Sequence, residues 1–128
     1  MKSKRLHADG GGTTWAIVLD RGDEAVAVLS AFAREQGITA AHFTAIGAFR
    51  AAVLGYFDRE RKDYTRIPID ELHAHAVLGR SDGSARGGHL LEGHVWPTLE
   101  VVLQQSPRHL RKKLDPAVGL ALIDLDAA

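Results

Sequence analysis

The chain has 128 residues, enough for one domain that buries about two-thirds of its unfolded surface, and we expect a single domain over residues 1–128. Lys plus Arg and Asp plus Glu both number 16, whereas a protein built mainly to neutralise nucleic-acid phosphates normally has a basic excess. There is no cysteine, which excludes disulfides and thiolate metal sites, so histidine, carboxylate, backbone or water must hold any metal.

No apolar run approaches the roughly 18–20 residues that cross a bilayer. The basic start at residues 1–5 is not followed by the apolar core of a signal peptide. These patterns predict a cytoplasmic protein with no membrane partner.

The first half of the chain predicts a strand, a helix and further strands. Residues 13–20 are rich in β-formers, and residues 21–37 carry an apolar stripe at helical spacing that indicates a helix packed on a sheet. Asp23 is the expected N-cap of this helix, and Gly37 the expected left-handed residue at its end. Residues 38–49, 51–58 and 63–70 then read as strands, with a charged hairpin loop at 58–64.

The second half predicts strands at residues 71–79, 87–95 and 98–105, with a polar turn at 80–86. Residues 106–114 resemble a short helical turn with Pro107 at its first position, and residues 118–125 a final strand. The predicted fold class is α+β, a mainly antiparallel β-sheet flanked by one main α-helix.

Four of the seven histidines lie between residues 72 and 94. His73 and His75 share a face of an extended strand, because side chains alternate. A two-residue turn at Asp82-Gly83 would place His89 opposite Ala76, on the other face. An odd-length loop, or a bulge at the glycines 87–88, would shift the register by one; pairing Val77 with His89 would bring the three histidines to one face.

Two interpretations of this cluster stay open from the spacing. Histidines on strands are more often exposed or hydrogen-bonded than metal ligands. Three histidines without a protein carboxylate would instead leave an open position on a metal, as in catalytic zinc sites. His94 is a candidate fourth member, and His42, in an apolar run, is expected to be a hydrogen-bonded core or interface residue. Candidate supporting carboxylates, which can equally be surface groups, are Asp70, Glu92 and Glu100.

The stretch HAHAVLGRSDGSARGGHLLEGHVWPTLEVVL resembles the PPC domain (plants and prokaryotes conserved), and the resemblance extends to HFTAIGAFRAAVLGYFD, DYTRIPIDE and GLALIDL. It implies an antiparallel sheet flanked by helix, assembled as a homotrimer. Some stand-alone prokaryotic members are metal-containing, and His73, His75 and His89 match the family's histidine positions; zinc is the expected metal. Plant members are DNA-associated, but this chain has no Arg-Gly-Arg-Pro hook, so the support for DNA as a partner is weak.

This chain departs from the family between Glu71 and Leu72, where relatives carry a strand pair of roughly 20 residues. Its loss would leave an exposed sheet edge for a neighbouring subunit or a rearranged strand to cover. The resulting hypothesis is an oligomeric, metal-holding module with a binding or regulatory role. The alternatives are a metal-dependent enzyme acting on a small substrate, for which no reaction can be named, and a nucleic-acid-associated protein.

Overall fold

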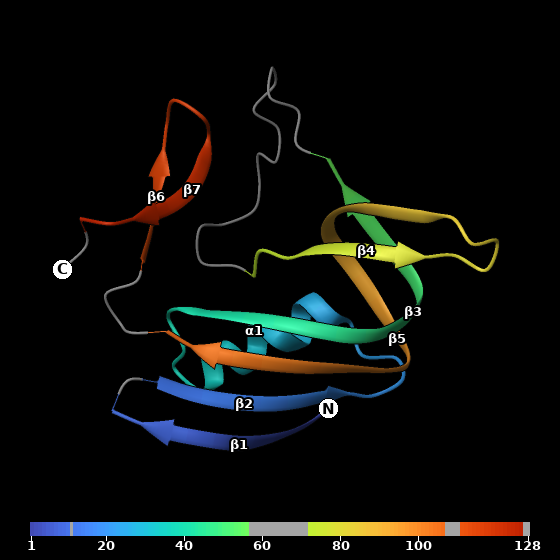
Figure 1. Ribbon diagram of the computed structural model, residues 1–128, viewed down its shortest axis with the longest axis horizontal. Helices are drawn as coiled ribbons and strands as arrows, with labels where there is room; N and C mark the ends of the chain where they lie inside the picture. Colours follow the sequence, from blue (N-terminus) through green and yellow to red (C-terminus); the bar gives the residue numbers. More distant parts are fainter. Residues whose placement is uncertain (11, 57–71, 107–110, 127–128) are drawn as a thin grey trace.

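The computed structural model describes residues 1–10, 12–56, 72–106 and 111–126. Its elements are β1 (Lys2–Asp9), β2 (Gly12–Leu19), α1 (Ala25–Glu35), β3 (Ala41–Gly55), β4 (His75–Gly79), β5 (Ala85–Gln105), β6 (Arg111–Asp115) and β7 (Leu120–Asp124). Five strands form an antiparallel sheet in the order β1-β2-β5-β3, and β4 pairs with the first part of β5 (Figure 1). A mainly antiparallel sheet with one α-helix among the described residues confirms the predicted fold class.

The hydrophobic core lies between α1 and one face of the sheet (Figure 1). Leu29 and Phe32 of the helix are buried, as the apolar stripe predicted, and the ring of Phe32 meets that of Trp15 edge to face at 5.3 Å. The sheet supplies alternate residues, which is the period of two that a half-covered sheet requires. These sheet residues are Ile17 and Leu19 of β2 and Val95, Leu99, Val101 and Leu103 of β5.

The helix begins one residue later than predicted, because Glu24 rather than Asp23 is the N-cap. The Glu24 carboxylate accepts hydrogen bonds from the backbone N–H groups of Val26 at 3.2 Å and Ala27 at 2.8 Å, and from that of Gly93 on β5 at 2.9 Å. Asp23 instead accepts from the backbone N–H of Asp20, at 2.9 Å. One carboxylate thus satisfies the first turn of α1 and fastens it to β5.

Glu24→Ala should lower the free energy of unfolding by about 2 kcal/mol, because it removes a cap and leaves the Gly93 N–H without its acceptor. Urea denaturation measures the change. Glu35→Ala, at the exposed far end of the same helix, is the matched control and should stay within about 0.5 kcal/mol of wild type. If Glu24→Ala lowers the free energy of unfolding no more than the control does, the hydrogen bonds of the Glu24 carboxylate contribute nothing to stability.

In two places, two consecutive predicted strands form one continuous strand in the structure. β3 runs through residues 41–55 and β5 through residues 85–105, the latter across the cis Trp96-Pro97 bond. The register between them shifts next to Gly47, where an added Cβ would collide with the carbonyl oxygen of Thr98. Glycine there permits the close approach of the two strands where they bend.

Other expectations need correction. β1 was not predicted; it is an edge strand exposed along its whole length, so it lacks the apolar alternation that marks a half-buried strand. Residues 111–115 are strand β6 rather than part of a helical turn, and the predicted last strand, β7, pairs with β6 in a separate two-stranded sheet. The predicted strand at 63–70 and the loop at 58–64 lie outside the described residues.

Candidate metal centre

The hairpin between β4 and β5 sets the position of His89. The backbone N–H of Arg80 donates to the carbonyl oxygen of Ser84 at 2.7 Å, and that of Gly83 donates to the carbonyl oxygen of Arg80 at 3.0 Å. Gly83 has a φ of 85°, the left-handed conformation that a residue at the end of a three-residue hairpin loop commonly adopts. Asp82 stabilises the turn by accepting hydrogen bonds from the Ser84 N–H and hydroxyl at 2.9 Å and 2.6 Å.

This loop has the odd length that the histidine cluster requires, but the register differs from the predicted one. His75 pairs directly with His89, and Val77 pairs with Gly87 rather than with His89. The shift arises in the turn, since β4 and β5 pair without interruption past the two glycines. Gly88 has another role: an added Cβ would lie 2.9 Å from the carbonyl oxygen of Gly55 on β3.

The chain before β4 keeps the alternation that puts His73 beside His75. The carbonyl oxygen of Ala74 accepts from the Leu90 N–H at 2.9 Å, which continues the pairing one residue before the strand. Ala74 is buried and Leu72 packs against the core. Because side chains alternate along an extended chain, His73 and His75 point to the opposite side from Leu72 and Ala74.

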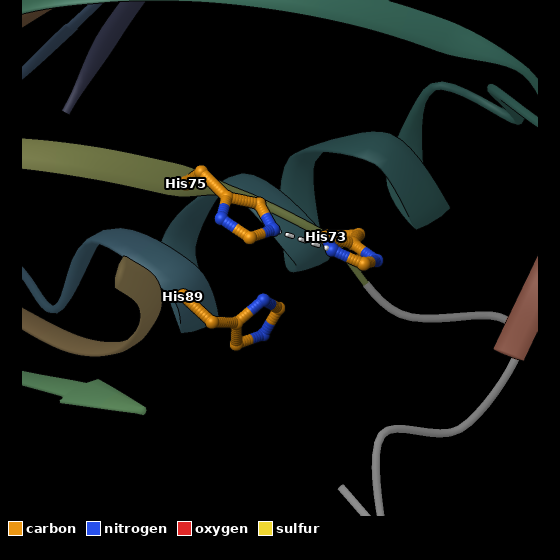
Figure 2. A group of neighbouring side chains, drawn as sticks. All are labelled: His73, His75 and His89. Carbon is orange, nitrogen blue, oxygen red and sulfur yellow. Dashed lines mark hydrogen bonds between the residues drawn. The ribbon is translucent and has the colours of Figure 1, made fainter. Parts of the chain in front are cut away.

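The three imidazoles converge (Figure 2). The Nε2 atoms of His73 and His75 lie 3.0 Å apart, and the ring of His89 meets the other two edge to face, with centroids 4.6 Å and 5.4 Å away. One ligand nitrogen from each residue lies within 4.8 Å of the other two. His89 is only 2% exposed, whereas His73 and His75 are exposed, so the cluster has a buried base and an open rim.

The surroundings favour neutral imidazoles. Desolvation lowers the pKa of His73, and the charges of His89, Lys112 and His75 lower it further, in that order. Burial, followed by the charge of His75, lowers the pKa of His89. A histidine must be neutral to bind a metal, so both residues are in the ligand form at neutral pH.

The other sequence candidates lie elsewhere. Among the described residues the cluster contains the three histidines alone; His94 instead pairs with Glu92 at 3.4 Å. His42 is exposed, which corrects the expectation of a core residue, but the expected hydrogen bond is present, to Gln104 at 2.8 Å. Glu100 lies on the sheet among exposed apolar residues. Asp70 is outside the described residues.

Sequence reasoning missed Lys112 as an electrostatic neighbour of His73. No local pattern could have identified it, because it lies on β6, far along the chain, in a segment predicted to be helical.

The sequence profile of the Plants and Prokaryotes Conserved (PCC, or PPC) domain matches residues 6–73 and 68–107. The chain belongs to this family. The two matches meet at residues 68–73, where the resemblance to the PPC domain places the missing strand pair. No curated protein sequence matches this PPC-domain chain. Among the described residues, no helix is long and apolar enough to cross a membrane.

Solved structures share the fold over nearly the whole chain. A PPC protein from Pyrococcus horikoshii is 28% identical with a TM-score of 0.75, and the match covers 92% of this chain and 97% of that protein. A metal-containing protein from Archaeoglobus fulgidus is 31% identical with a TM-score of 0.73, covering 94% and 99% of the two chains. A Bacteroides thetaiotaomicron protein named "putative DNA binding protein" is 24% identical with a TM-score of 0.79, covering 94% and 96%.

Proposed function

We propose that this PPC-domain protein holds one zinc ion through His73, His75 and His89 and acts as a binding or regulatory module. The observation that supports it best is the convergence of three ligand nitrogens within 4.8 Å of one another. The similar Archaeoglobus fulgidus protein is described as metal-containing, which agrees with a metal at this fold.

The donor set fits zinc. With Zn–N distances of about 2.0–2.1 Å, nitrogens around a tetrahedral ion lie about 3.4 Å apart. The separations in this cluster, from 3.0 Å up to 4.8 Å, bracket that value, so small side-chain rotations would complete the geometry. Imidazole favours zinc and other late transition metals over magnesium or calcium, which prefer oxygen ligands.

Three protein ligands leave a fourth position for water or an exogenous group. The exposure of His73 and His75 gives solvent and small molecules access to that position. This access is what favours the second candidate function, a metal-dependent enzyme acting on a small substrate. A bound zinc would supply Lewis-acid chemistry there, and the histidines would hold it without a protein carboxylate.

We also propose that the protein assembles as a homotrimer, as its family resemblance implies. Val18, Ile46 and Val102 are exposed together on the sheet face opposite α1, where a neighbouring subunit could cover them. Light scattering at micromolar concentration should give three times the chain mass of 13.9 kDa, and a monomer would contradict this proposal.

DNA association is supported only by the names of similar structures such as the Bacteroides protein. The zero net charge argues against strong non-specific binding. A duplex-binding assay at two salt concentrations tests it, and the absence of binding near physiological salt would remove this function.

The pH dependence of zinc affinity tests the metal proposal. The pKa values of His73 and His89 are lowered from the ordinary 6.5, so protons on these two ligands should compete little with zinc at pH 7 and above. As the pH falls through the lowered pKa values, the ligands protonate and zinc should leave. Calorimetric titration should give similar dissociation constants at pH 8.0 and 7.0 and one at least about ten-fold weaker at pH 5.0. An affinity unchanged down to pH 5.0 would contradict this prediction.

A further inference from the structure

A second concave surface lies away from the histidine cluster. It is a groove of about 570 Å³ bordered by the bent part of β3, by β4 and by the start of β5. None of the three clustered histidines lines it. Its volume falls in the range of about 300–1,000 Å³ that is usual for small-molecule sites.

Among the described residues, the charged side chains that line the groove are all arginines. Arg50 comes from β3, Arg80 from the turn after β4, and Arg86 from β5, so the fold gathers cations that are far apart in the sequence. All three are exposed, and none of the described residues that line the groove carries a carboxylate. Within the described part of the chain, no ion pair joins any of them to an acidic side chain. Three like charges at one concave surface repel one another, and a bound anion would relieve that repulsion.

The remaining lining is partly apolar and includes Leu54, Val77 and Leu78. Val77 is 79% exposed, an unusual state for a large aliphatic side chain on a strand. A ligand that suits both features carries a compact anionic group and an organic part with apolar surface.

We propose that this groove binds the phosphate group of a small organic phosphate. The guanidinium group matches phosphate geometry with two parallel hydrogen bonds, which makes arginine the preferred residue for this anion. The aliphatic side chains would contact the organic part. Three arginines neutralise one or two phosphate groups, fewer than the 6–10 phosphate contacts typical of salt-dependent DNA binding. A small ligand therefore fits better than a duplex.

The proposal is independent of the zinc site, so the test uses the chelator-treated full-length protein. Adenosine monophosphate is the probe, and calorimetry or NMR titration gives its affinity. Arg80→Gln and Arg86→Gln should each weaken its binding at least about ten-fold. Arg34→Gln, which removes the same charge from the exposed end of α1, is the matched control and should change it less than about two-fold. Circular dichroism should show all three variants folded, since each replaced side chain is exposed.

Two further ligands separate the parts of the proposal. Adenosine, which lacks the phosphate, should not bind detectably, and inorganic phosphate should bind at least about ten-fold more weakly than adenosine monophosphate. Equal binding of adenosine would overturn anion recognition, and equal binding of inorganic phosphate would overturn the role of the organic part. The absence of saturable binding, an equal loss in Arg34→Gln, or binding of a single-stranded oligonucleotide but not of the mononucleotide would overturn the proposal as a whole.

Discussion

His89→Ala is expected to abolish zinc binding at micromolar concentration, a loss on the order of 100-fold or more in affinity. Removing a partner that merely orients a ligand already costs 10–100-fold, and His89 would be a ligand itself. It is also the most fixed of the three, because it is buried and its backbone is paired with Gly55 on one side and His75 on the other. Competition with a fluorescent zinc chelator measures the change.

His94→Ala is the matched control, because His94 lies on the same strand outside the cluster. Its zinc affinity should stay within about two-fold of wild type. Since His89 is buried, His89→Gln is a second variant that keeps much of the side-chain volume and should lose zinc equally while remaining folded. Zinc binding retained by both His89 variants, or lost equally in His94→Ala, would contradict the assigned ligands.

Phe32→Ala should lower the free energy of unfolding by about 3–5 kcal/mol, the cost of removing a fully buried aromatic side chain and leaving a cavity. Phe32 is 2% exposed, and its ring is the partner of Trp15 in an edge-to-face contact. A loss of this size is a large share of the 5–15 kcal/mol that stabilises a typical domain. Urea denaturation measures it.

Ile46→Ala provides the comparison for that measurement. Ile46 is 77% exposed on the uncovered face of the sheet, so an isolated chain should lose no more than about 0.5 kcal/mol. If an assembly covers this face, the decrease in the free energy of unfolding caused by Ile46→Ala would become larger as the protein concentration rises. A Phe32→Ala loss below about 1.5 kcal/mol would contradict the position of the core between α1 and the sheet.

The parts of the fold predicted correctly are those encoded in short-range patterns. The apolar stripe around Leu29 and Phe32 repeats with the helical period, and Gly37, with a φ of 64°, ends the helix as expected. The cap was misplaced by one residue because Asp23 and Glu24 are adjacent and both can accept hydrogen bonds. The choice depends on Gly93 of β5, which donates to Glu24 and which helix periodicity cannot locate.

Strand continuity and pairing were harder to predict, because they depend on distant segments. β1 is exposed throughout and is held by its pairing with β2, so its own sequence carries no apolar alternation. Residues 111–115 were misread as helical because a basic run after a proline suits a helix start as well as an exposed strand.

Part of the candidate site could be predicted from the sequence. The two-residue spacing of His73 and His75 fixes their common face, whereas the face of His89 depends on whether the loop has an odd or even length. Asp82-Gly83 fits a two-residue turn as well as the longer loop observed, so local sequence left the register open. The groove of Arg50, Arg80 and Arg86 was not predicted, since only the bend of β3 across β5 brings Arg50 near the hairpin.

The most direct test of the metal site is the metal content of the purified protein after zinc has been supplied and weakly bound ions have been removed by desalting. Elemental analysis should find close to one equivalent of zinc per chain in wild type and in His94→Ala, and less than about one-tenth of an equivalent in the variant that replaces His73, His75 and His89 together. Only trace metal in the wild-type protein, or equal zinc in wild type and the triple variant, would contradict it.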